Sequence, residues 1–135
     1  MKNHIEILRN LQKNGSLSGR ELARSLGISV SAVDNCVKAL RDWEFGISDL
    51  PGTGYQLTES LQFIDERWLR KELASKGLLI EDRLEVLEEV DSTSEYLLAW
   101  PDRESLHGRT CVTEFQSQGR GRRGRTWLGV PCRNI

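Results

Sequence analysis

The stretch Leu26-Gly27-Ile28-Ser29 decides the fold of the first part of the chain, because it separates two short segments with helical spacing of apolar residues. Gly27 ends the first segment, since glycine tolerates the left-handed conformation that closes a helix. Ile28 can fill the angle between the helices, and Ser29 is a favoured residue at the start of the next one. A tight turn of this kind between two helices predicts a helix-turn-helix.

The flanking segments support this prediction. The sequence SGRE at residues 18–21 predicts a capping box, in which Ser18 accepts from the amide of Glu21 and the glutamate reaches back. A helix is predicted ahead of it, over residues 4–11, ending at Asn14-Gly15. The helix after Ser29 has apolar residues on one face: Val33, Cys36, Val37 and Leu40.

A hairpin is predicted directly after these helices. Two short alternating runs, residues 45–50 and 55–57, flank the turn sequence PGTG at residues 51–54. Three helices followed by a hairpin form the layout of a winged helix-turn-helix, whose second motif helix enters the DNA major groove. We therefore predict a DNA-binding domain over residues 1–60.

The outward side chains of the third helix are the candidates for DNA contact. Asparagine pairs bidentately with adenine and lysine favours guanine, whereas hydroxyl and guanidinium groups suit phosphates. The predicted base-reading residues are Ser31, Asn35 and Lys38, and the predicted phosphate contacts are Ser29 and Arg41.

The charge of this part leaves an alternative open. Residues 1–60 carry seven basic and seven acidic side chains, whereas a strong non-specific DNA binder is usually basic. Asp34 would also face the phosphates. The alternative is an interaction or dimerisation module whose third helix is simply solvated.

The second part of the chain is predicted to be a mixed α/β segment. A helix over residues 65–73 precedes a strand at 84–90, which runs into a Ser/Thr-rich helix start, and a second strand follows at 110–115. Ligands in such domains bind where strand ends and helix starts converge. Ser92 and Glu95 also fit a plain capping box, which is the alternative for this helix start.

The sequence GRGRRGR at residues 119–125 follows the second strand directly. Its glycines let the backbone approach a ligand, and its arginines match carboxylate and phosphate oxygens. Residues 109–135 carry six basic and one acidic side chain, although the whole chain has a net charge of −1. We expect a loop that is mobile until an anion fills it. A solvated basic turn and an RNA-binding glycine-arginine segment are the alternatives, the latter weakened because the motif occurs once.

Composition excludes other classes. The sequence contains no apolar run without charges that is long enough for a transmembrane helix, so none is predicted. Glu6 comes too early for a secretory signal. The cysteines Cys36, Cys111 and Cys132 have neither an even number nor a metal-ligand spacing. We expect a reduced cytoplasmic protein with no membrane partner and no metal ligands.

The sequences DSTS at residues 91–94 and QSQGRGRRGRTW at residues 116–127 together resemble the start of the catalytic domain of biotin protein ligases. The segment ahead, with LRDW at residues 40–43 and PGTGY at residues 51–55, is similar to the bifunctional class that also represses the biotin operon. The expected fold is α+β. A winged helix-turn-helix over residues 1–60 is followed by the first, incomplete part of a mixed α/β biotin ligase catalytic domain over residues 61–135.

The resemblance implies a function. The family activates biotin with ATP and magnesium to biotinyl-5′-adenylate, releases pyrophosphate, and transfers the biotinyl group to a lysine of a biotin carboxyl carrier domain. The liganded protein forms a homodimer and binds operator DNA. The family's ligand positions carry over to Ser92, Thr93, Ser94, Gln116, Arg120, Gly121 and Arg122. Arg120 and Arg122 take the catalytic role, since their charge offsets the repulsion between two anions.

The sequence departs from the family in three places. Ser94 stands where the family usually has asparagine, and Cys132 stands at a glycine position. The family's catalytic lysine strand and small C-terminal β-domain are not found in this sequence. We therefore expect no ligase activity from this chain alone. The alternative is a stand-alone winged-helix transcriptional regulator with a vestigial ligand domain.

Overall fold

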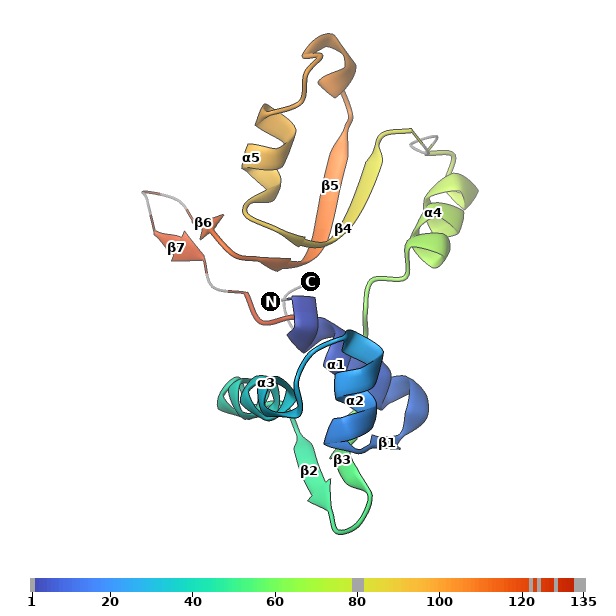
Figure 1. The fold of residues 1–135 in the computed structure, drawn as a ribbon. Helices are drawn as coiled ribbons and strands as arrows, with labels where there is room; N and C mark the ends of the chain where they lie inside the picture. The colour runs from blue at the N-terminus through green and yellow to red at the C-terminus, as the bar shows by residue number, and fades with distance from the viewer. Residues whose placement is uncertain (1, 79–81, 122, 124, 128, 133–135) are drawn as a thin grey trace. The chain divides into compact units, whose positions relative to one another are not determined.

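The computed structural model describes residues 2–78, 82–121, 123, 125–127 and 129–132. The chain folds into two compact units, residues 1–61 and residues 62–135. Among the described residues, the first unit has one three-stranded sheet and the second unit has two two-stranded sheets, each unit with its own helices (Figure 1).

The first unit is formed around helices α1 (Lys2–Asn14), α2 (Gly19–Leu26) and α3 (Val30–Asp42). Their apolar faces meet in one core, which removes aliphatic surface from water. The fully buried side chains of this core are Ile5, Ile7, Leu8, Leu11, Leu22, Val33, Val37 and Leu40. The predicted apolar face of α3 is confirmed, except that Cys36 is only half-buried.

The turn between α2 and α3 is the predicted helix-turn-helix. Ser18 Oγ accepts from the amide of Glu21 at 3.2 Å, and a Glu21 carboxylate oxygen accepts from the amide of Ser18 at 2.8 Å, which confirms the capping box. Gly27 ends α2 with a φ of 66°, in the left-handed region. Ser29 Oγ then caps α3 by accepting from the amide of Ala32 at 3.1 Å.

The predicted hairpin is present as strands β2 (Ile47–Leu50) and β3 (Gly54–Leu57). The sequence did not predict the short strand β1 (Ser16–Leu17), which pairs antiparallel with β3 to give the order β1-β3-β2. A run of two residues has no periodicity to reveal it, so β1 depends on its pairing with a segment about forty positions away in the chain.

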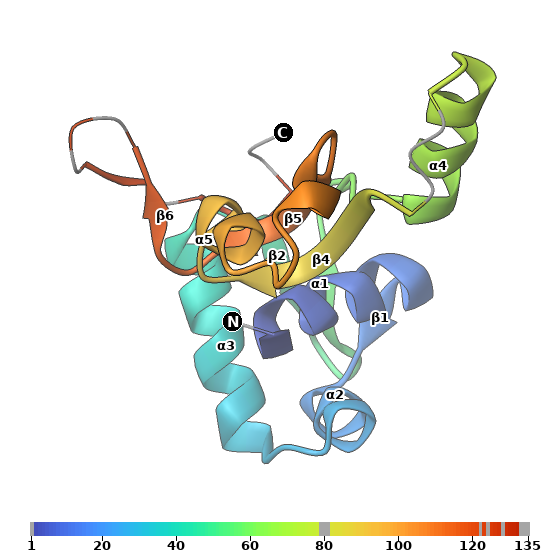
Figure 2. The same ribbon diagram turned by 90° about the horizontal axis from the view of Figure 1, so that it is seen from above.

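The second unit contains α4 (Glu66–Ser75), β4 (Leu84–Val90), α5 (Thr93–Leu98), a 3-10 turn (Glu104–Leu106) and β5 (Thr110–Gln116). β4 and β5 pair in parallel, from Leu84 opposite Thr110 to Val90 opposite Gln116. Helix α5 lies beside β5 in both views (Figures 1 and 2). The predicted α+β class is confirmed.

An arginine attaches the segment after α5 to this sheet. The Arg109 guanidinium lies 3.9 Å from the ring centroid of Trp100, and it also pairs with Glu85 on β4 at 2.7 Å. A cation over an aromatic face is attracted by the ring's negative face. The return from α5 to β5 is therefore tied to the strand pair.

Among the residues that the structure describes, no helix combines the length and the apolar character needed to cross a membrane.

Replacing Gly54 by alanine will open the sheet of the first unit. Gly54 has a φ of +119°, and an added Cβ would lie against the carbonyl oxygen of Leu17 on β1. Backbone strain and this clash together lower the free energy of unfolding by about 2–4 kcal/mol. Urea unfolding of the full chain, followed by circular dichroism, measures the loss.

Gly52→Ala is the matched control for this measurement. Gly52 also has a positive φ, +77°, but an added Cβ meets no atom within 4 Å. Only the left-handed strain remains, about 1 kcal/mol. Equal losses in the two variants would show that the contact between Gly54 and β1 does not matter.

Candidate DNA-binding surface and ligand site

The exposed face of α3 gathers the predicted base-reading residues. Ser31, Asn35 and Lys38 follow one another at spacings of four and three, so they lie on one side of the helix. All three side chains are exposed, whereas Val33 and Val37 between them are buried. The structure therefore brings the donors and acceptors together on one polar stripe beside the hairpin β2–β3.

The predicted phosphate contacts already have intramolecular partners. Ser29 Oγ caps α3 and lies 3.0 Å from Ser31 Oγ. Arg41 Nε donates to the carbonyl oxygen of Ile47 at 2.9 Å, and its Nη2 pairs with the Asp49 carboxylate at 2.9 Å. Both residues thus hold local structure, and Arg41 joins α3 to β2.

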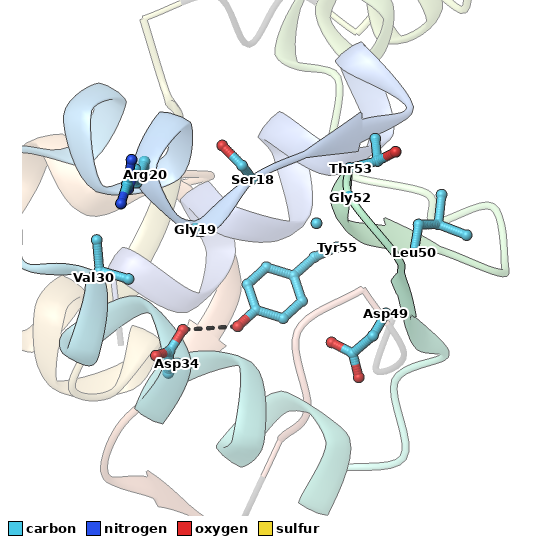
Figure 3. A pocket seen from close by; sticks show the side chains of 11 residues that line it. Ser18, Gly19, Arg20, Val30, Asp34, Asp49, Leu50, Gly52, Thr53 and Tyr55 are labelled. Carbon is cyan, nitrogen blue, oxygen red and sulfur yellow. Dashed lines mark hydrogen bonds between the residues drawn. The ribbon is translucent and has the colours of Figure 1, made fainter.

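A tyrosine of the hairpin makes a further contact with α3, which the sequence did not reveal. The Tyr55 hydroxyl donates to Asp34 Oδ1 at 2.7 Å, as the dashed line in Figure 3 shows. The Arg41 guanidinium lies 5.9 Å from the centroid of the Tyr55 ring. Asp34, which counted against DNA binding in the sequence, has a structural partner on the hairpin.

These residues border a shallow hollow of about 430 Å³ within the first unit. It is lined by the start of α2, the first turns of α3 and the tip of the hairpin, including Arg20, Val30, Asp34, Asp49 and Tyr55 (Figure 3). The hollow thus lies between the stripe on α3 and the hairpin.

The second candidate site lies at the carboxyl ends of β4 and β5, which meet at one edge because the strands are parallel. Gln116 Oε1 accepts from the amide of Thr93 at 2.9 Å and from Thr93 Oγ1 at 3.2 Å. Ser117 Oγ donates to Asp91 Oδ1 at 2.6 Å. The predicted ligand residues Thr93 and Gln116 are therefore in direct contact.

The capping box offered as the alternative for Ser92 and Glu95 is wrong. Ser92 occupies the N-cap of α5 but makes no capping hydrogen bond with its side chain, and it is 3% exposed. The Glu95 carboxylate instead pairs with Arg120 Nη1 at 3.0 Å, so it does not reach back to Ser92. Ser94 is exposed on the first turn of the helix.

The glycine-arginine segment begins in a strand and is followed directly by another, where the sequence predicted only a loop. β6 (Gly119–Arg120) pairs antiparallel with β7 (Thr126–Trp127), and the amide of Gly121 donates to the carbonyl oxygen of Arg125 at 2.7 Å. Arg122, predicted to be catalytic, lies outside the described residues. Glu95, the partner of Arg120, was absent from the predicted site, and no sequence signal pointed to this pair because the two residues lie 25 positions apart.

Comparison with known proteins agrees with this arrangement. Residues 2–42 match the family described as winged helix-turn-helix DNA-binding. Helices α1–α3 lie in this match and the hairpin β2–β3 follows it, so the first unit has the fold of a winged helix-turn-helix.

Two curated proteins are similar to most of the chain. The bifunctional ligase/repressor BirA of Salmonella typhimurium is 40% identical over 113 residues, 82% of this chain and 32% of that protein. The protein of the same name from Escherichia coli is 38% identical over 121 residues, 87% of this chain and 35% of that protein. The chain spans about a third of the length of these relatives and resembles the N-terminal portion of a bifunctional ligase and repressor.

The bond between Tyr55 and Asp34 will make stability depend on alkaline pH. It raises the pKa of Tyr55 from 10 to about 12, since the hydroxyl must keep its proton to donate. A raised folded-state pKa contributes stability that is complete below about pH 10 and is lost as the pH rises toward 12. The measurement is a pH titration of tyrosinate absorbance in a Tyr96→Phe variant, in which Tyr55 is the one remaining tyrosine.

Two variants check the cause of this shift. In Asp34→Asn the Tyr55 pKa moves back toward its ordinary value, and in Tyr55→Phe the loss of stability over this pH range disappears. An unchanged Tyr55 titration in Asp34→Asn would contradict the assigned bond.

Proposed function

We propose that this chain binds operator DNA as a transcriptional repressor and carries the first part of a biotin ligase domain that senses biotin. The observation that carries the DNA-binding part is the exposed stripe of Ser31, Asn35 and Lys38 on α3, flanked by the hairpin. Such a helix presents amide and ammonium groups to base edges in the major groove. The hairpin then lies beside the DNA backbone.

The proposal explains why the first unit has no net charge. Non-specific binding depends on the number of phosphates that a protein neutralises, so a unit with seven basic and seven acidic side chains binds arbitrary DNA weakly. Affinity then depends on base contacts and on pairing of two chains over a two-fold operator. A liganded homodimer supplies that pairing.

The biotin-sensing part is supported by the polar edge at Thr93 and Gln116 and by the neighbouring hairpin β6–β7. The carboxyl-terminal edge of β4 and β5 offers hydroxyl and amide groups that can hydrogen-bond the neutral polar part of a ligand. Arg120 offers a guanidinium for the ligand's carboxylate or for a phosphate. The sequence resemblance to biotin ligases names biotin and ATP as the molecules that fit.

In the complete reaction, the biotin carboxylate attacks the α-phosphorus of ATP. The new O–P bond forms as the bond to pyrophosphate breaks. The amine of a carrier-domain lysine later attacks the biotinyl acyl carbon, and AMP leaves as the acyl–oxygen bond breaks. Arg120 would offset the negative charge that gathers at phosphorus, and no nucleophilic side chain is required. Mg²⁺ keeps several waters and binds substrate phosphates in nucleotide sites, so we assign it to ATP. A cytoplasmic location is part of the same proposal.

A gel-shift titration tests the DNA-binding part. The probes are a duplex that the chain itself selects from a random-sequence pool and a shuffled duplex of equal composition. Asn35→Ala lowers affinity for the selected duplex about tenfold, since one base contact is lost. Lys38→Ala lowers affinity for the selected duplex about tenfold and for the shuffled duplex much less, since the lost contact is to a base edge.

The matched control is Lys13→Ala, which removes the same charge from the exposed end of α1. It is expected to leave both affinities unchanged. If Lys13→Ala and Lys38→Ala behave alike, α3 is not the surface that meets DNA, and the alternative of an interaction module is favoured.

Calorimetric titration with biotin tests the sensing part. Gln116→Leu removes the acceptor that orients Thr93, so biotin binding weakens at least tenfold. Gln118→Leu is the matched control, because it makes the same change two residues away at an exposed side chain. Absence of any binding heat with the unsubstituted chain would favour a stand-alone regulator.

A further inference from the structure

The helix that is proposed to read DNA carries a carboxylate on its exposed side. Asp34 is exposed and lies three positions after Ser31 and four before Lys38, so it neighbours both on the helix surface. A carboxylate there repels phosphates, which opposes every mode of DNA binding. Asp34 therefore needs an explanation other than base reading.

The hydrogen bond from the Tyr55 hydroxyl gives Asp34 a structural function. It donates to Asp34 from β3, 21 positions further along the chain. A hydrogen bond to an ionised carboxylate is stronger than one between neutral groups. It therefore links the first half of α3 to the hairpin, as Figure 3 shows.

A second link joins the other end of α3 to the same hairpin. Arg41 lies seven residues, or about two helical turns, after Asp34, and it binds Ile47 and Asp49 on β2. The two links thus hold different strands of the hairpin, β3 and β2, at two levels of the helix. A hairpin held at two levels keeps one orientation relative to α3.

We propose that Asp34 and Tyr55 form a specificity-determining pair, which holds the hairpin in the orientation that suits a cognate duplex and weakens binding to all other DNA. The inference rests on the proposed DNA-binding function. Fixing the hairpin in advance favours only the duplex on which helix and hairpin fit at once. The Asp34 charge acts against every duplex, and only the cognate one offers enough contacts to offset it.

The two residues separate these effects, because each can be changed without the other. Tyr55→Phe keeps the Asp34 charge and removes the link. Affinity for the selected duplex falls about fivefold, affinity for the shuffled duplex is unchanged, and the salt slope stays the same because no phosphate contact is lost. Asp34→Ala removes both charge and link, so affinity for the shuffled duplex rises about threefold while the ratio of the two affinities falls.

Asp42→Ala is the matched control for the charge. It removes a carboxylate from the exposed end of the same helix, at a residue with no bond to Tyr55. Both affinities rise together and their ratio is unchanged. The double variant, Asp34→Ala with Tyr55→Phe, has the same ratio as Asp34→Ala alone, since the link can be lost only once.

The measurement is a fluorescence-anisotropy titration of the full chain with each duplex at several salt concentrations. Thermal unfolding of each variant shows that it is folded at the assay temperature. If the unsubstituted chain discriminates clearly and Tyr55→Phe has the same ratio of affinities for the selected and shuffled duplexes, the proposed role of the pair is wrong. The proposed DNA-binding function then still stands. If the unsubstituted chain does not discriminate between the duplexes, the proposed function fails and the role of the pair fails with it.

Discussion

The left-handed turn at Gly27 is the constraint on which the first unit depends. With a φ of 66° this residue ends α2 and redirects the chain, so that α3 packs its apolar face against α1 and α2. Burial of Val33, Val37 and Leu40 then leaves the opposite side of α3 exposed. The polar stripe follows from this packing, because a helix that buries one face presents the other to solvent.

The contacts between α3 and the hairpin give this surface its shape. Tyr55 and Arg41 connect two strands to two turns of the helix, and both bonds involve carboxylates that also lower the local positive charge. Stability and charge are thus linked at the same residues. In our proposal, this link allows a neutral domain to favour particular DNA sequences over DNA in general.

The second unit is arranged around the parallel pairing of β4 and β5. Parallel strands end on the same side, so Asp91, Thr93, Gln116 and Ser117 meet at one edge although they come from segments about 25 positions apart. The large apolar side chains Trp68 and Trp127 remain exposed in this unit.

The sequence by itself determined the features that depend on neighbours within one or two turns. These include the capping box of Ser18 and Glu21, the helix end at Gly27, and the buried face of α3. Only the tertiary structure decided the pairing of β1 with β3, the bond between Tyr55 and Asp34, and the ion pair between Glu95 and Arg120. Local propensity reports the conformation of a segment, whereas a contact between distant segments also depends on how the core brings them together.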